Sequence, residues 1–421
     1  MQTNNQDSRA EAVIIENIIS QHAEEAAFLW LLRDDAVKAP HYSLKDLKRL
    51  EERIEAHLDG LRVAGEAAWQ FCKDGLQQEE AGEVFTAGYM ALDNAREDWL
   101  SQTLEVVEAV PETARGIISA LGWAPKEKLQ GHVVNWLRSE KPQHVRLGIS
   151  ACAIQRVDCG AYLKQAVDSE VETVRARALR SVGEIRRQDL MPMLTEHLQD
   201  EDFACRFWSA WSATLLGDAN ALETLQGFVA ESGSGAALSL ALRAMDKSSA
   251  MRWVRDLNGN AAFRRLVVEA AGIIGDPVSI PWLIASMQTP ELARVAGEGF
   301  SLITGVDLAY DDLDRDEPED FAAGPTDDPE DEDVSMDPDE DLPWPDPALV
   351  ADWWGRNKAN FPAGQRLICG QPVSREACMR VLQRGFQRQR RAAALELALL
   401  NPKEPLFNTS ATARRQESLL A

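Results

Sequence analysis

Apolar residues recur every three or four positions along much of the chain, and two stretches repeat the same order of features. In VRARALRSVGEIRRQDLMPMLTEHLQDED, Val174, Ala178 and Val182 lie four residues apart, and three leucines follow at the same spacing. A second stretch, LVVEAAGIIGDPVSIPWLIASMQTPE from Leu266, has the same succession of apolar run, glycine, proline and apolar run. This spacing places the apolar residues on one helical face, so each stretch predicts two amphipathic helices.

Glycine and proline separate the predicted helices. Gly183 and Gly275 lie where the first helix of each pair should end, because glycine adopts the left-handed conformation at least cost. Pro192 and Pro281 lie in the first turn of the second helix, where a missing N–H matters little. Similar glycines are Gly122, Gly217 and Gly305. The successive intervals are 61, 34, 58 and 30 residues, about one or two times a unit of 30 residues.

The segments VRARALRSVG and AAGIIGDPVSIPWLIASMQTPE resemble HEAT-like repeats, particularly the short type also seen in phycobilin lyases. A single helix pair cannot bury its apolar face alone, so neighbouring pairs must stack. We therefore expect an all-α fold, a HEAT-like α-solenoid of stacked helix pairs over residues 111–305. The resemblance implies a binding surface in most such proteins and an enzyme in some.

Residues 1–110 are also predicted to be helical, but they lack the period of 30 residues. The clearest helix there begins after Ser43 as its cap and ends near Gly60. Its apolar stripe consists of Leu44, Leu47, Leu50, Ile54 and Leu58. Because the end of a solenoid needs a cover with a polar outer face, we expect this region to be an N-terminal helical cap.

Composition changes sharply after the repeats. Residues 306–346 hold 19 acidic residues, one basic residue and six prolines, which predicts a disordered acidic linker. Residues 347–421 hold 12 Lys and Arg against 5 Asp and Glu, and their pattern predicts a small helical tail. Because the charge reverses sign, we expect the tail to pack against acidic surface, either the linker or the solenoid. We predict that its two helices dock on the carboxy-terminal end of the solenoid.

The net charge of −24 argues against a nucleic-acid partner, because binding to a phosphate backbone needs clustered Lys and Arg. The first residues lack the features of a secretory signal, and no apolar run approaches the roughly 20 residues needed to cross a bilayer. We therefore expect a cytoplasmic protein without a membrane partner. The six scattered cysteines are expected to be buried small hydrophobes.

No combination of residues predicts catalysis, a metal or a cofactor. His22 and Glu25 lie one helical turn apart, but further ligands are missing. The acidic run DDPEDEDVSMDPDED lacks the glycine and glutamate of a calcium loop, and SGSGAALSLAL lacks the lysine of a phosphate-binding loop. We expect no catalytic residue and no cofactor.

Two groups of residues in the last part of the chain are candidates for contacting a partner protein. The motif DLPWPDP holds Trp344 near a polyproline conformation, and Trp353 and Trp354 follow on a predicted helix. These tryptophans either tether the tail to the solenoid or anchor a partner. The basic cluster Arg388, Arg390 and Arg391 pairs either within the chain or with a protein partner.

Several segments together resemble a bacterial family of HEAT-like-repeat proteins often encoded beside type VI secretion components. They are HAEEAAFLWLLRD, RLEERIEAHLDGLRVAG, DLPWPDP, the pair Trp353 and Trp354, GFQRQRRAAALELAL and PLFNTSA. The resemblance implies an adaptor or co-chaperone whose partner is a secreted effector, a spike-tip protein or a secretion adaptor.

The sequence thus favours a noncatalytic protein-binding scaffold that uses the concave face of the solenoid. An enzyme built on the solenoid, lyase-like by analogy with other short HEAT-type proteins, is the alternative from another class. Nucleic-acid binding is disfavoured by charge.

Overall fold

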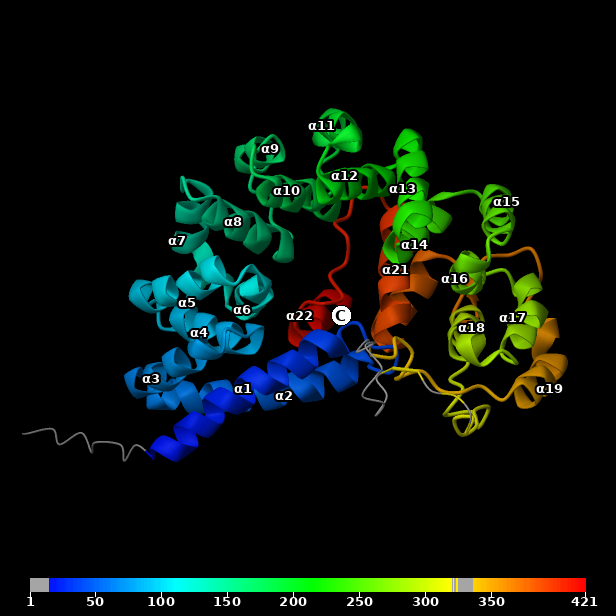
Figure 1. Cartoon of the computed structure of the whole chain (residues 1–421), viewed down its shortest axis with the longest axis horizontal. Helices are drawn as coiled ribbons and strands as arrows, with labels where there is room; N and C mark the ends of the chain where they lie inside the picture. Colours follow the sequence, from blue (N-terminus) through cyan, green and yellow to red (C-terminus); the bar gives the residue numbers. More distant parts are fainter. Residues whose placement is uncertain (1–14, 320, 322, 325–335) are drawn as a thin grey trace, which may run out of the picture. The chain divides into compact units, whose positions relative to one another are not determined.

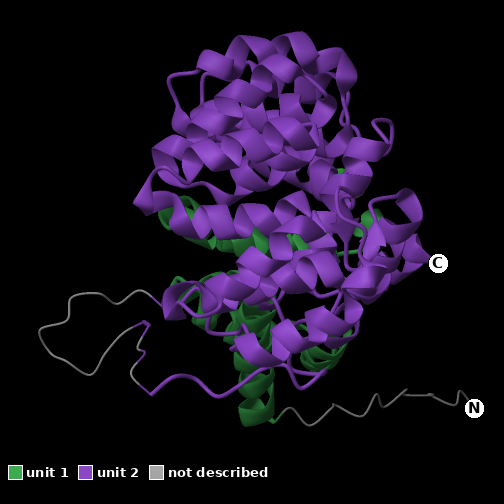
Figure 2. Ribbon diagram, turned by 90° about the vertical axis from the view of Figure 1, so that its right-hand side faces the viewer, with its two compact units in different colours: residues 1–35, 48–131 green, residues 36–47, 132–421 purple. Residues whose placement is uncertain are grey.

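The computed structural model describes residues 15–319, 321, 323–324 and 336–421. Within these residues the fold is all-α, as predicted, apart from one two-stranded hairpin. The chain forms two compact units (Figure 2), of residues 1–35 with 48–131 and of residues 36–47 with 132–421. None of the described helices is both long enough and apolar enough to cross a membrane.

The first unit is a helical bundle with an aromatic core. Its helices are α1 (Glu16–Ala36) and α2 (Leu44–Ala64), most of whose residues belong to it, α3 (Glu66–Gly75), α4 (Ala81–Asp93), α5 (Glu97–Ala109) and α6 (Ala114–Trp123). The short 3₁₀ turns η1 (Leu76–Gln78) and η2 (Pro111–Thr113) join some of them. Trp30 stacks on Phe85 with ring centroids 5.3 Å apart, and Trp69 stacks on Trp99 at 4.7 Å.

The boundary of this unit lies beyond the predicted residue 110. Helix α6 packs against α4, and Gly116 allows this contact because a Cβ there would lie 2.1 Å from the carbonyl oxygen of Ala81. The chain thus belongs to the first unit through α6 and part of α7 (Lys126–Leu137). The apolar stripe predicted for α2 is buried, but the helix continues past Gly60, where a Cβ would meet the ring of His22 at 2.5 Å.

The second unit contains the stacked pairs (Figure 1). Its inner helices are α8 (Pro142–Ile154), α10 (Glu172–Ile185), α12 (Phe203–Leu216), α14 (Gly235–Ala244), α16 (Arg264–Ile274) and α18 (Pro290–Thr304), each packed on the next along most of the series. The outer helices are α9 (Ala161–Val167), α11 (Met191–Glu196), α13 (Ala219–Ser232), α15 (Lys247–Leu257) and α17 (Ile280–Ser286). The 3₁₀ turns η3 (Gln188–Leu190), η4 (His197–Gln199), η5 (Ala261–Phe263) and η6 (Pro277–Ser279) lie in the connections. Each outer helix packs on an inner one. One apolar core runs from α8 to α16 and a second lies around α17 and α18, so the solenoid prediction is confirmed.

Three of the five predicted stop glycines end helices in the left-handed conformation. They are Gly217, Gly275 and Gly305, with φ angles of 99°, 73° and 77°. Gly183 instead lies inside α10, and Arg186 is the left-handed residue that ends the helix. Gly183 is needed for close packing, because a Cβ there would lie 2.6 Å from the Ser212 hydroxyl of α12. Gly122 also lies inside its helix.

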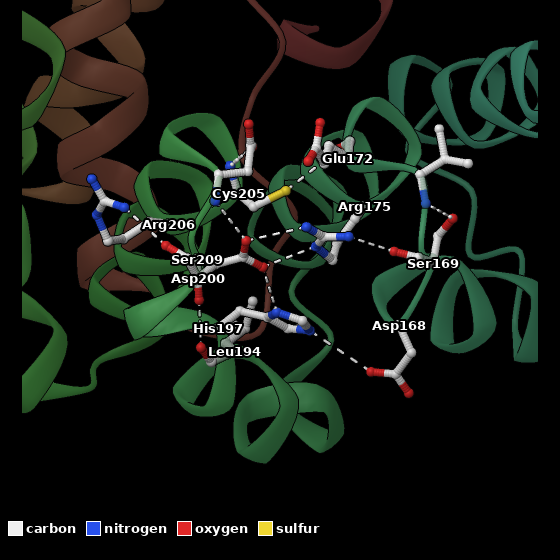
Figure 3. A network of polar contacts seen from close by, with 12 residues as sticks. Asp168, Ser169, Glu172, Arg175, Leu194, His197, Asp200, Cys205, Arg206 and Ser209 are labelled. Carbon is white, nitrogen blue, oxygen red and sulfur yellow. Dashed lines mark hydrogen bonds and ion pairs between the residues drawn. The ribbon is translucent and has the colours of Figure 1, made fainter.

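A polar network joins α10 to the start of α12 (Figure 3). Arg175 of α10 donates from Nε and from a terminal nitrogen to the Asp200 carboxylate, at 2.9 and 3.1 Å. His197 lies 2.9 Å from the same carboxylate through Nδ1. Asp202 caps α12 by accepting from the Cys205 N–H at 2.8 Å. Because Arg175 and Asp200 are largely buried, this network fixes the position of α12 relative to α10.

The described parts of the acidic segment are packed, which differs from the disorder predicted for residues 306–346. Leu308 and Leu313 join the apolar core at the end of the repeats, and Leu342 is buried as well. Asp339 is 4% exposed because its carboxylate accepts two hydrogen bonds from Arg265 of α16, at 2.6 and 2.7 Å. Apolar residues and ion pairs within the acidic run therefore order its two ends. Most of the run considered for calcium lies outside the described residues.

The tail is helical with one hairpin. It contains α19 (Pro347–Asn357), η7 (Lys358–Asn360), β1 (Leu367–Ile368), β2 (Gln371–Pro372), α20 (Arg375–Arg384), α21 (Gln387–Leu400) and α22 (Ala413–Leu420). The hairpin is antiparallel, with Leu367 opposite Pro372. It seals the end of the array, because the Leu367 N–H donates to the Gly275 carbonyl at 2.8 Å and the Cys369 N–H to Leu302 at 2.7 Å.

The tail reaches further than its predicted docking place at the carboxy-terminal end. Helix α21 packs on α12 and α14, on the inner side of the stack (Figure 1). The buried Arg186 side chain fixes it there by donating to the carbonyl oxygens of Pro402, Ala398 and Leu215, at 3.0, 2.7 and 2.7 Å. Beyond α21 the Leu406 N–H donates to the Glu184 carbonyl at 2.9 Å. The tail thus runs back along the inner face to α10.

Candidate functional site

A hollow of about 570 Å³ lies between the inner helices of the repeats and the returning tail. One wall comes from α10, α12, α14, α16 and α18, and the other from α21 and residues 406–410. Its charged lining residues are Arg156, Arg180, Arg243, Arg265, Arg388, Arg391, Glu184, Glu269 and Glu298. Its larger apolar lining residues are Trp208, Trp211, Ile273, Val295, Leu302, Leu395, Leu406 and Phe407.

Three arginines share one carboxylate at one end of the hollow. Arg177 and Arg180 donate to the two oxygens of Glu184 at 3.0 Å each, and the Arg156 guanidinium lies 3.9 Å away. Burial alone would raise the pKa of the Glu184 carboxyl, but the three guanidiniums outweigh it and lower the pKa from 4.5 to about 2. Burial lowers the pKa of the Arg156 guanidinium to about 10. One negative charge therefore faces three positive ones.

Aromatic rings lie beside this cluster on α12. The Arg180 guanidinium carbon lies 4.4 Å from the ring centroid of Trp208, a cation–π distance, and the side chain remains 45% exposed. Trp208 and Trp211 contact each other edge to face, with centroids 5.6 Å apart. The hollow therefore combines guanidinium groups with an aromatic wall.

The other end of the hollow holds two carboxyl groups. Arg388 of α21 donates to Glu298 of α18 at 3.1 Å, and Arg265 lies 3.2 Å from Glu269 on α16. Burial raises the pKa of both carboxyls, although Arg265 and Arg388 act in the opposite direction. The Arg243 side chain between the two ends is buried and pairs with Glu396 at 3.3 Å.

The predicted tryptophans lie in contacts within the chain. Trp344 is 8% exposed, with the Arg294 guanidinium 4.6 Å from its ring centroid. Trp353 contacts Phe300 of α18 edge to face at 5.6 Å, and Trp354 contacts Phe361 at 5.6 Å. Trp344 and Trp353 therefore contact α18 of the solenoid, as the tether interpretation expects, whereas the Trp354 contact lies within the tail. None of the three lines the hollow.

The predicted arginine cluster is divided. Arg388 and Arg391 line the hollow, whereas Arg390 is fully buried inside the tail, where its Nε donates to the Leu382 carbonyl at 2.7 Å. Arg390 also donates to the side chains of Gln387 and Gln416. Its role is to hold α20, α21 and α22 together. Adjacent positions on one helix therefore face different surroundings.

Sequence reasoning missed Glu184, Arg180 and Trp208. The spacing of four residues between Arg180 and Glu184 on one predicted helix was the available signal. It did not reveal the hollow, because the opposite wall comes from residues 180 or more positions later.

The remaining candidates from the sequence are the histidine region, the cysteines and a glycine-rich segment. His22 lies 3.1 Å from His57 through the Nδ1 atoms, yet the described residues contain no group of three His, Cys, Asp or Glu side chains arranged to hold a metal. Cys72, Cys152, Cys205 and Cys378 are buried as expected, while Cys159 and Cys369 are partly buried. Only Gly233 and Ser234 of the segment SGSGAALSLAL connect two helices, since its last eight residues belong to α14, which Ser234 caps.

Comparison with known proteins supports the architecture. Residues 161–246, from α9 to the end of α14, match the family of HEAT repeats. No curated protein and no solved structure matches the chain. Residues 161–246 are therefore a HEAT-repeat region within an all-helical solenoid, and they contribute α10, α12 and α14 to the wall of the hollow.

Proposed function

We propose that the protein is a noncatalytic scaffold that holds a segment of a partner protein in the hollow on the inner face of its second unit. The observation that carries this proposal is the mixed lining of the hollow, in which Arg180 and the aromatic wall of Trp208 and Trp211 lie together. Arginine and tryptophan are the residues most often found at the energetic centres of protein interfaces. HEAT repeats generally present such binding surfaces.

The finer proposal is an adaptor or co-chaperone in the bacterial cytoplasm that loads a type VI secretion effector or spike-tip protein. Its support is the resemblance of segments such as DLPWPDP and PLFNTSA to a family often encoded beside those components. Phe407, Asn408, Thr409 and Ser410 of the second segment line the hollow. The resemblance and the candidate site thus meet at the same residues.

A lyase-like enzyme is the second candidate. The observation that favours it is the pair of carboxyls, Glu269 and Glu298, whose raised pKa values suit a general acid. Both carboxyls, however, form an ion pair with an arginine, and this pairing favours their charged form. We therefore favour the binding scaffold over the enzyme.

The test is affinity purification of the tagged full-length protein from the cells that produce it, followed by mass spectrometry. We compare the wild type with Trp208→Ala and with Trp282→Ala, which removes a 41% exposed tryptophan from the outer helix α17. A partner retained in stoichiometric amount by the wild type and by Trp282→Ala, but lost from Trp208→Ala, supports the scaffold. Circular dichroism checks that both variants fold.

Two results contradict the proposal. If the wild type retains a small molecule and no protein, the result favours the enzyme over the scaffold. If Trp208→Ala retains the partner as fully as the wild type does, the hollow is not the binding site. Identification of an effector or spike-tip protein supports the type VI secretion role, and an unrelated partner contradicts that role alone.

A further inference from the structure

The lining of the hollow has a charge opposite to that of the chain. The protein carries a net charge of −24, yet six arginines and three glutamates line the hollow. Charge that is enclosed by protein is screened less by salt than charge on an open surface. Two of these arginines, Arg243 and Arg265, also pair with Glu396 and Asp339 outside the lining, and the remaining excess makes the hollow a local positive field on an acidic protein.

At the α10 end of the hollow, the positive charge of the arginines around Glu184 is not neutralised by that carboxylate. Glu184 already accepts from Arg177 and Arg180 and lies near Arg156, so its single charge is shared among three guanidiniums. Arg180 keeps 45% of its side chain exposed beside Trp208. Its remaining N–H groups are available to a ligand in the hollow.

Arg391 adds a second guanidinium on the opposite wall. Among the described residues its only hydrogen bond is a long one of 3.4 Å to the Val37 carbonyl, and it forms no ion pair with any of them. The Arg391 side chain is exposed and lines the hollow, so its guanidinium can donate to an anion that binds there.

We propose that the hollow recognises an acidic peptide segment, with carboxylates bound by Arg180 and Arg391 and an apolar or aromatic side chain packed against Trp208 and Trp211. This inference rests on the proposed scaffold function and specifies the chemistry of the partner. Arginine binds carboxylates through two parallel N–H groups, so the pairing also orients the peptide.

A peptide fits these observations better than a nucleic acid does. Double-stranded DNA carries one charge about every 1.7 Å, and the net charge of −24 repels so long a polyanion. A short acidic peptide meets only the local field of the hollow, because charges are screened over about 8 Å at physiological salt. The volume of 570 Å³ lies within the roughly 300–1,000 Å³ of sites that bind compact ligands.

The test uses fluorescence anisotropy with the full-length protein and a short fluorescein-labelled peptide in which aspartate and glutamate flank a central tryptophan. The control peptide has asparagine and glutamine in place of the acids. The protein variants are Arg391→Gln and, as a matched control, Arg255→Gln, which removes the same charge from an exposed position of α15.

We expect the acidic peptide to bind the wild type, and Arg391→Gln to weaken binding by about tenfold, the usual effect of losing a hydrogen bond between charged groups. Arg255→Gln should leave the affinity unchanged, Arg391→Lys should recover part of it, and added salt should weaken binding.

Four results overturn the inference. They are no binding of the acidic peptide at about 1 mM, equal binding of the uncharged peptide, equal losses in Arg391→Gln and Arg255→Gln, and tighter binding of a single-stranded oligonucleotide. The scaffold proposal is judged separately. If the native partner is lost from Trp208→Ala but is retained by Arg391→Gln, the scaffold stands and the acidic-peptide inference falls.

Discussion

Replacing Glu184 with glutamine removes the one carboxylate that three arginines share in the second unit. The side chain is 7% exposed, and its oxygens accept from Arg177 and Arg180 at 3.0 Å. Glutamine has nearly the same shape, so the change is mainly one of charge. The guanidiniums would then face one another without a counter-charge, in a place that water reaches poorly.

Two independent routes give the size of the effect. Removing one partner of a buried ion pair typically lowers the free energy of unfolding by about 3–5 kcal/mol. The pKa of the carboxyl gives a similar figure, because lowering it from 4.5 to about 2 makes the ionised form contribute about 3 kcal/mol to folding at neutral pH. We therefore expect Glu184→Gln to destabilise the second unit by about 3 kcal/mol.

The pH dependence follows from the direction of the shift. Because the pKa of Glu184 is lower in the folded than in the unfolded chain, its contribution is complete above about pH 5 and is lost as the pH falls towards 2. The stabilities of wild type and variant should therefore converge on acidification. Hydrogen exchange of the α10 and α12 amides, followed at several pH values, measures this difference locally.

The control is Glu223→Gln, which makes the same chemical change at an exposed position of α13 and should alter stability by less than about 0.5 kcal/mol. If Glu184→Gln matches this control at neutral pH, the argument from the shared carboxylate is refuted. If the stability difference between the wild type and Glu184→Gln is the same at neutral and acidic pH, the variant loses stability through packing and not through charge.

Three further changes test the packing of the two units. Asp200→Asn should lower the free energy of unfolding of the second unit by about 3 kcal/mol, measured by urea denaturation, whereas Asp189→Asn, at a 61% exposed carboxylate, should change it by less than about 1 kcal/mol. Gly116→Ala should destabilise the first unit by about 1–3 kcal/mol through overpacking on α4, whereas Gly131→Ala, with no atom near the added methyl group, should be neutral or stabilising in thermal unfolding. Arg390→Met should speed hydrogen exchange throughout α20, α21 and α22, and unchanged exchange there would contradict its assigned role in the tail.

The helices and their stacking were predictable because burial of one helical face leaves a period in the sequence. Leu47, Ile54 and Leu58 are fully buried in α2 as their spacing predicted. Gly275 and Gly305 end α16 and α18 as expected, since a left-handed helix end depends only on local backbone conformation. Such signals lie within a few residues of each other.

Contacts between distant segments left no comparable signal. The sequence predicts a helix end at Gly183, but the role of this glycine depends on Ser212 of the neighbouring helix. Composition alone indicated that the acidic segment is disordered, yet Asp339 is buried because Arg265 of α16 lies opposite it. In both cases the deciding partner lies more than 25 residues away, so no local pattern identifies it.

The candidate site was missed for the same reason. The concave face was expected to bind a partner, and Arg388 and Arg391 were among the expected residues, but the sequence did not place them opposite Arg180 and Trp208. Adjacent residues of a helix also point in different directions, so Arg390 is buried while Arg391 faces the hollow. Only the path of the tail decides which arginines meet.

That path also limits how the scaffold can work. An open concave face would offer a partner a broad surface, but α21 covers its middle, and Arg186 holds the tail there through the backbone carbonyls of Ala398 and Pro402. What remains is a bounded hollow whose two walls come from the repeats and from the tail. In the proposed binding mode, recognition depends on both walls being in place, because Arg180 and Arg391 lie on opposite sides of the hollow. A change that loosens the tail should therefore weaken binding even where every residue of the repeat wall is intact.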